Sequence, residues 1–175
     1  MTDNTIALHQ VTLADADALL TISRDTFFYF FGPLNEAANM DAYAAKSFTQ
    51  ERIRAEIENP GSKFYFAMID GEVAGYLKLN FEEAQSEFQE KDALEVERIY
   101  VAKEHHGKKI GQYLLNFATQ TAIDQNMSYI WLGVWEHNHN ALGFYQHHGF
   151  TVFANHPFML GSDLQNDLLM KKQLK

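Results

Sequence analysis

The sequence predicts an α/β fold built around one core. Apolar residues make up 46% and aromatic residues 14% of the 175 positions, which is enough to bury a substantial core. Segments with strand and helix patterns alternate along the chain, without an internal repeat or a low-complexity linker between them. The clearest such series runs from Leu94 to Phe150. We therefore expect one domain spanning residues 1–175.

The first half of the chain is expected to hold three helices and three strands. Residues 6–11 have a strand pattern, and Thr12 followed by Asp15 resembles a helix N-cap before an apolar helical pattern. Gly32 and Pro33 should end that helix after a run of aromatic residues at 27–31. The other expected elements are helices near 41–46 and 49–58, a hairpin of strands 64–69 and 73–80, and a loop at 82–92.

The second half has clearer periodicity. A strand at 94–101 precedes a segment whose apolar residues recur at helical spacing from Ile110 to Ala122. The remaining expected elements are strands at 128–135, 151–155 and 165–173, with a helix at 140–147 between the first two. Strands that alternate with helices in this way favour a mixed sheet.

Charge and composition limit the possible functions. The net charge of −9 disfavours a nucleic-acid partner and is compatible with a cationic substrate. The absence of cysteine excludes disulfides, thiolate metal ligands and a cysteine nucleophile. Residues 1–4 lack a leader pattern, and no apolar run reaches about twenty residues, so we expect a cytoplasmic protein without a membrane partner. His137 and His139 lack a carboxylate that would complete a metal site, and no metal is expected.

The turn after residue 101 has features of a phosphate-binding site. A helix N-terminus offers unpaired N–H groups and a partial positive charge. Gly107 and Gly111 would allow close approach of a ligand, and Lys108 and Lys109 add positive charge. The spacing matches neither a Walker A loop nor the three-glycine dinucleotide motif. The alternative is a plain strand–helix connection.

At this turn the chain resembles the GNAT superfamily of N-acetyltransferases. The pyrophosphate motif of that family, Gln/Arg-x-x-Gly-x-Gly/Ala, falls on residues 106–111, with His106 in place of Gln or Arg and Lys109 in place of the first Gly. The resemblance implies a GNAT fold: a mixed, mostly antiparallel sheet of about six to seven strands, flanked by helices and opened by a central strand splay. It also implies acetyl-CoA as co-substrate.

A second segment resembles the same family without a gap. It reads Asn-x-x-Ala-x-x-Phe-Tyr-x-x-x-Gly-Phe, from Asn138 to Phe150. The resemblance implies that Tyr145 protonates the departing thiolate and that the strand at 99–101 pairs with pantetheine and polarises the thioester. The implied cofactor-binding residues are Ile99, Tyr100, Val101, His106, Gly107, Lys108, Lys109, Ile110, Gly111, Asn138 and Tyr145.

The resemblance to the GNAT superfamily also implies that a carboxylate, at Glu95 or at Glu97, accepts the proton of the attacking amine directly or through water. The two glutamates lie two residues apart on one strand and would face one side if no bulge intervenes. An ammonium group with a pKa near 10 must lose a proton before it can attack. Glu97 is favoured over Glu95 as this base. The alternative is a structural ion pair with Arg98 or a lysine.

Most of the chain, from about residue 26, resembles the PaiA-type bacterial polyamine acetyltransferases. The resemblance rests on residues 64–67, 75–80, 97–101, 130–136 and 167–171. It implies direct acetyl transfer to a primary amine, foremost a polyamine or diamine such as spermidine, and a possible homodimer. Trp135 and Glu136 are the expected amine-pocket residues, although the two tryptophans could instead be core aromatics. Two alternatives stay open: another amine acceptor, such as a peptide N-terminus, an amino acid or an aminoglycoside, and a non-catalytic CoA-binding sensor.

Overall fold

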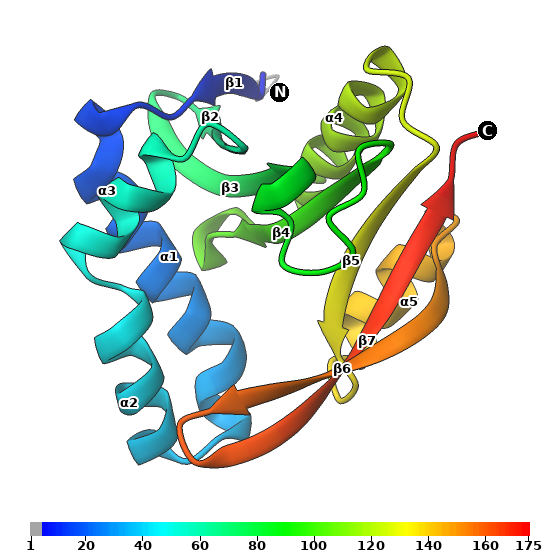
Figure 1. Cartoon of the computed structure of the whole chain (residues 1–175). Coiled ribbons are helices and arrows are strands. Elements are labelled where there is room, and N and C mark those ends of the chain that lie inside the picture. Colours follow the sequence, from blue (N-terminus) through cyan, green and yellow to red (C-terminus); the bar gives the residue numbers. More distant parts are fainter. Residues whose placement is uncertain (1–4) are drawn as a thin grey trace.

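A seven-stranded mixed sheet organises the chain, with the strand order β1-β2-β3-β4-β5-β7-β6 (Figure 1). The computed structural model describes residues 5–175, so the expectation about the N-terminal four residues lies outside the described part. Among the described strands, β4 and β5 form the only parallel pair, and every other pair is antiparallel. The strands are β1 (Ala7–Gln10), β2 (Ser62–Ile69), β3 (Glu72–Phe81), β4 (Ala93–Val101), β5 (Tyr129–Trp135), β6 (Thr151–Leu160) and β7 (Asp163–Gln173).

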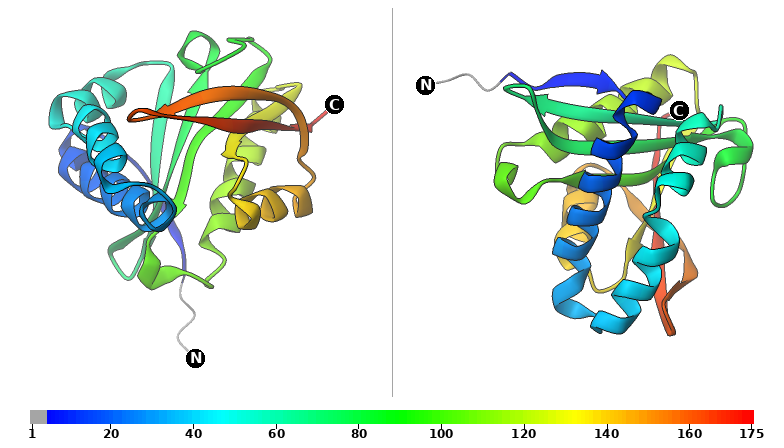
Figure 2. Two further views of the ribbon diagram at one scale, coloured as in Figure 1. Left: turned by 90° about the horizontal axis from the view of Figure 1, so that it is seen from below. Right: turned by 90° about the vertical axis from the view of Figure 1, so that its left-hand side faces the viewer.

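Five α-helices flank the sheet on two sides, as Figure 2 shows. One side carries α1 (Ala16–Phe31), α2 (Ala37–Ser47) and α3 (Gln50–Glu58), and the other carries α4 (Ile110–Asp124) and α5 (His139–His147). The first side packs on the buried Phe64, Phe66 and Tyr76, whereas α4 packs on Leu77 and Leu79. Alternate residues of β3 thus serve opposite layers. None of the helices in the described chain is long and apolar enough to cross a membrane.

Local signals account for the helix boundaries on the first side. The backbone N–H of Thr12 donates to Asp15 Oδ2 at 2.8 Å, which completes the expected capping box before α1. The helix continues through the aromatic run to Phe31 and ends before a 3₁₀ turn that contains Pro33. Thr49 caps α3 by accepting from the Arg52 N–H at 3.2 Å.

The middle of the sheet opens between β4 and β5. Their pairing is limited to Ala93–Glu95 opposite Tyr129–Trp131, and beyond these residues the two strands separate. The expected central splay is therefore present. It leaves the second half of β4 without a strand partner on its β5 side, where its backbone can meet a ligand.

A β-bulge interrupts β4 at Glu97. Arg98 pairs with Lys78 and Val96 pairs with Leu79, so that Glu97 is the extra residue. As a result, Glu95 and Arg98 lie on the α1–α3 side of the sheet, while Val96 packs against the α4 layer. Simple alternation therefore no longer relates Glu95 to Glu97. Both side chains nevertheless reach one residue and one cavity, since the Asn80 side-chain amide donates to Glu95 at 3.0 Å and to Glu97 at 2.5 Å.

The last hairpin is longer than the sequence suggested. β6 extends to Leu160, five residues beyond the expected end, and β7 begins at Asp163. Most residues of β6 are exposed, so they lack the alternation of apolar and polar residues that indicates a strand, and Pro157 argued against one. Because β6 is an edge strand, proline is tolerated there. The hairpin of β6 and β7 extends toward α2 (Figure 1). There the ring centroids of Phe158 and Tyr43 lie 5.4 Å apart. The loop expected at 82–92 contains one 3₁₀ turn, Glu82–Ala84.

Candidate active site

A cavity of about 770 Å³ lies where β4 and β5 separate. Its wall has two sides, which we call the donor side and the acceptor side. The donor side is formed by the end of β4, the following turn and α5 and includes Val101, His106, Gly107, Gly111, Asn138, Ala141, Phe144 and Tyr145. The acceptor side includes Phe27, Phe31, Tyr43, Glu95, Trp131, Trp135, Phe158 and Asp167.

The turn before α4 keeps the geometry of a phosphate loop. Lys109, at the N-cap, adopts a left-handed conformation with φ 60° and ψ 20°, which is the conformation that glycine would provide most easily. The backbone therefore holds its shape although the usual glycine is replaced. Gly107 and Gly111 line the cavity, but the Lys108, Lys109 and Ile110 side chains do not. Ile110 is buried in the core, so only its backbone could contact a cofactor.

His106 contacts the last residue of β4. Its Nε2 lies 3.0 Å from the Val101 carbonyl oxygen, and its ring centroid lies 5.4 Å from Tyr29 and 5.5 Å from Phe30. The imidazole thus joins the phosphate loop to α1. The same contact occupies the Val101 carbonyl, one of the groups expected to pair with pantetheine.

The two residues of the second motif lie on the donor side. Asn138 accepts from the Ala141 N–H at 3.2 Å through its side-chain oxygen and so caps α5, which leaves its amide nitrogen available. The side chain of Tyr145 is buried and lines the cavity. Burial raises the pKa of the Tyr145 phenol, so it stays protonated at neutral pH. Its hydroxyl forms no hydrogen bond with residues 5–175.

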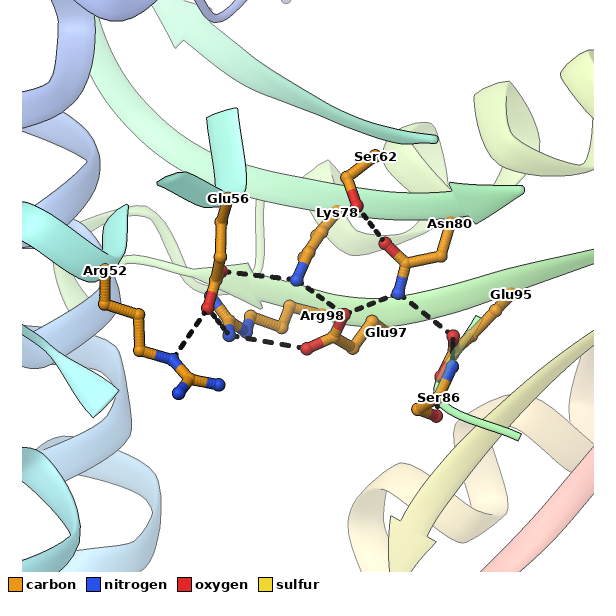
Figure 3. Close-up of polar contacts among 9 residues, drawn as sticks. All are labelled: Arg52, Glu56, Ser62, Lys78, Asn80, Ser86, Glu95, Glu97 and Arg98. Carbon is orange, nitrogen blue, oxygen red and sulfur yellow. Dashed lines mark hydrogen bonds and ion pairs between the residues drawn. The ribbon is translucent and has the colours of Figure 1, made fainter. Parts of the chain in front are cut away.

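A polar network crosses from α3 to β4 (Figure 3). Glu56 lies 3.2 Å from Lys78 Nζ and 3.0 Å from Arg98 Nη1. Glu97 lies 2.6 Å from Lys78 and 3.3 Å from Arg98. Arg52 also lies 3.1 Å from Glu56, so two carboxylates face three cations. Burial raises the pKa of the Glu97 carboxyl, but the charges of Arg98 and Lys78 outweigh it and hold that pKa below the usual value.

Glu95 differs from Glu97 because no cation lies beside it among residues 5–175. It is only 3% exposed and accepts hydrogen bonds from the Ser86 backbone N–H at 2.7 Å, the Ser86 hydroxyl and the Asn80 amide at 3.0 Å. Burial raises the pKa of the Glu95 carboxyl, and these hydrogen bonds oppose the increase without cancelling it. Ser86 gave no signal in the sequence, because it lies in a loop without periodicity.

The expected amine-pocket residues separate in the structure. Trp135 lines the cavity, with its ring 6.2 Å from Phe31. Glu136 is not part of the cavity wall, and its carboxylate accepts from Asn166 at 3.3 Å. Trp131 is buried, and its indole N–H donates to the Gln85 side-chain oxygen at 2.8 Å. The same side chain belongs to a small separate cluster of the core and also forms part of the cavity wall. The sequence did not identify Asp167, which reaches the wall from β7.

Comparison with known proteins identifies the family. Residues 18–150 match the model of the acetyltransferase (GNAT) family, and the chain belongs to that family. A relative from Lactobacillus delbrueckii subsp. lactis, described as an N-acetyltransferase, is 43% identical over 97% of this chain and 98% of its own length. The protein is an N-acetyltransferase, and the expected fold and reaction class are confirmed.

Two solved structures share the fold. The PaiA N-acetyltransferase from Thermoplasma acidophilum, in complex with coenzyme A, has a TM-score of 0.80 at 21% identity, over 97% of this chain and 99% of that one. An acetyltransferase from Salmonella typhimurium with its cofactor acetyl-CoA has a TM-score of 0.73 at 20% identity, over 98% and 95%. In residues 5–175, no group of three histidine, cysteine, aspartate or glutamate side chains could hold a metal ion.

Proposed function

We propose that this protein transfers an acetyl group from acetyl-CoA to a primary amine, and that the acceptor is a polyamine or diamine such as spermidine. The observation that carries the proposal is Glu95, a buried carboxylate with no neighbouring cation among residues 5–175, in a cavity that is also lined by Tyr145. A positively charged amine would supply the missing charge. The fold neighbours that hold coenzyme A and acetyl-CoA support the donor.

The donor side would bind the cofactor. The first N–H groups of α4 and the turn at Gly107 would hold the pyrophosphate, since these groups have no partners inside the helix. Pantetheine would add alongside the open half of β4 at 99–101. Lys108 and Lys109 would contribute charge at the entrance rather than direct contacts within the cavity. Asn138 would contribute its free amide nitrogen.

The reaction would proceed by direct transfer. Glu95, acting directly or through a water, accepts the proton of the ammonium group, and the amine nitrogen then forms a bond to the thioester carbon. Backbone N–H groups of β4 stabilise the oxyanion. The C–S bond breaks as the intermediate collapses, and the phenol of Tyr145 gives its proton to the thiolate. After the attack the nitrogen still carries one excess proton, which it loses as the amide forms, and this proton restores the phenol of Tyr145 by way of solvent. Glu95 releases its own proton to solvent, so that the net products are the amide, coenzyme A and one proton.

We place Glu95 ahead of Glu97 as the base. The raised pKa of Glu95 makes it the stronger base for the amine proton. Glu97 has a lowered pKa and forms ion pairs with Lys78 and Arg98. Glu97 would then hold the network in place. The preference for Glu97 rested on the sequence alone and gains no support from these contacts.

The polyamine acceptor is supported by the acceptor side of the cavity. Its aromatic side chains and carboxylates suit a flexible cation, which gains from both cation–π contacts and charge attraction. Trp135 would be part of this wall. A role for Glu136 remains a prediction and would require its side chain to move. We also propose that the protein is a single domain, that it forms a homodimer and that it is located in the cytoplasm. Light scattering would test the homodimer.

Thiol release from acetyl-CoA with spermidine tests the function. Release that depends on spermidine, with a monoacetylated product by mass spectrometry, is the expected result. An amine-free reaction gives the hydrolysis background. If acetyl-CoA binds but no amine from a broad panel is acetylated, the activity is wrong for this chain and a CoA-binding sensor replaces it. If another amine is preferred, only the polyamine is wrong.

A further inference from the structure

The carboxylate of Asp167 is an unpaired charge in the cavity wall. Asp167 lies on β7 and lines the cavity, and within residues 5–175 its side chain forms neither a hydrogen bond nor an ion pair. Burial raises the pKa of this carboxyl; His156 opposes that increase, and Glu136 adds to it. A partly buried carboxylate without a partner is energetically unfavourable unless a ligand supplies a hydrogen bond or a positive charge.

The other acidic residues of the wall are occupied, apart from Glu95. Glu97 pairs with Lys78 and Arg98, and Glu87 contacts His156. Glu95 and Asp167 therefore remain as the two lining carboxylates without a basic side chain in contact, as far as the described residues extend. They lie at different places in the same cavity, which suggests two points of attachment for one ligand.

On β6, His156 lies opposite Asp167 and also lines the cavity, but its imidazole contacts Glu87. The β5 side of Asp167 leaves room for a cation. On β5, Trp135 pairs with Asp167, so the indole lies beside the carboxylate on the same face. The next residue on that face is Gly133, where an added Cβ would lie 3.9 Å from Asp167 Oδ2. Because glycine has no side chain there, the carboxylate is open to the cavity. An ammonium group could contact both the carboxylate and the indole.

The spacing of the two carboxylates sets the length of the ligand. Glu95 pairs with Trp131, and Asp167 pairs with Trp135, four residues further along β5. Four residues of a strand span about 13 Å. The nitrogens of a four-carbon diamine are only about 6 Å apart, given bonds of roughly 1.5 Å. The span of about 13 Å describes the backbone along β5, and β4 and β7 lie on opposite sides of that strand, roughly 10 Å apart. A short diamine would therefore reach both carboxylates only with the two side chains extended toward each other, whereas a longer one would need no such conformation.

We propose that Asp167 forms a second cation subsite, and that the acceptor is a long linear amine carrying a second positive charge near the far end. This inference rests on the proposed amine acetyltransferase activity and names the acceptor class more narrowly. One amine reacts beside Glu95, while the other remains charged against Asp167 and Trp135. The subsite would select length as well as charge.

Matched acceptors and variants test the subsite. The eight-carbon α,ω-diamine should be acetylated with a kcat/KM about tenfold or more above that of the amino alcohol of equal length, which lacks the second charge. Asp167→Asn should remove most of this difference, mainly by raising the KM for the diamine. The kcat/KM for the amino alcohol should stay within about twofold of its value in the unaltered enzyme. Asp163→Asn, on the same strand but outside the cavity wall, is the control and should change neither acceptor.

A binding measurement separates the subsite from the reaction. Titration of the eight-carbon diamine into the enzyme–CoA complex should give an affinity that Asp167→Asn weakens about tenfold. If binding weakens but no amine is acetylated, the subsite stands and the proposed function fails. If Asp167→Asn alters the two acceptors equally or not at all, and binding is unchanged, the subsite is wrong whether or not the enzyme is active.

Discussion

The donor side and the acceptor side of the cavity are built from the chain in different ways. The donor side uses two short continuous segments, 99–111 and 138–145, and depends largely on backbone groups and helix ends. The acceptor side gathers side chains from α1, α2, the 82–92 loop and the strands β4 to β7, which are far apart in the sequence. On the proposed function, a donor common to a whole family would be bound by backbone groups that vary little, while binding of the acceptor would depend on scattered side chains.

Replacing Glu95 tests the acceptor side most severely. Glu95→Gln should lower kcat about 100-fold or more, because the amine loses its proton acceptor. In the unaltered enzyme, the raised pKa means that activity falls with decreasing pH at values above the usual range of glutamate. The variant should lose this acid limb. The measurement is kcat/KM against pH, with acetyl-CoA affinity as a check on folding.

Glu97→Gln is the matched comparison for that experiment. It should retain the acid limb, although the loss of its contacts with Lys78 and Arg98 lowers stability. If Glu97→Gln abolishes the limb and Glu95→Gln keeps it, the two roles are reversed.

Replacing Tyr145 tests the chemistry of the donor side. Tyr145→Phe should lower turnover tenfold or more while acetyl-CoA affinity stays nearly unchanged, because only the proton for the thiolate is lost. No described residue is left unpaired by the change, so the melting temperature should stay close to that of the parent. Tyr113→Phe, on α4 and outside the cavity wall, serves as control. Unchanged turnover in Tyr145→Phe would remove Tyr145 from the reaction.

The smallest effect is expected at the phosphate loop. Gly111→Asp should weaken acetyl-CoA binding about fivefold, because it places a negative charge at the N-terminus of α4 near the pyrophosphate. Gly111→Ala controls for size, since a Cβ there would meet Phe144 and Val101 only at 3.9 Å. Equal affinities for both variants, measured by titration, would mean that the pyrophosphate lies elsewhere.

The sequence was sufficient for the features that depend on local patterns. The capping box at Thr12, the end of α1 near Pro33 and the helix after Gly107 follow from neighbouring residues. The family and the splay came from two motifs within sixty residues of each other. These features are also the ones that repeat across a protein family, and therefore the ones that a resemblance can carry.

The acceptor side could not be derived in the same way. Ser86 reaches Glu95 from an aperiodic loop, and Asp167 enters the wall only through the pairing of β7 with β5. The bulge at Glu97 leaves no trace in the alternation of 94–101, because charged residues occur in both phases there. The roles of Glu95 and Glu97 thus depend on contacts across the fold, and both remain predictions.

The bulge in β4 also changes the phase of the strand. Before it, odd-numbered residues such as Glu95 belong to the α1–α3 layer; after it, even-numbered residues such as Arg98 and Tyr100 do. One additional residue therefore lets the same strand offer a carboxylate to the cavity at one end and Ile99 and Val101 to the α4 layer at the other. An insertion or deletion of one residue between 95 and 98 would exchange the two layers for half of the strand. The length of this short segment is consequently as constrained as any single side chain in the site.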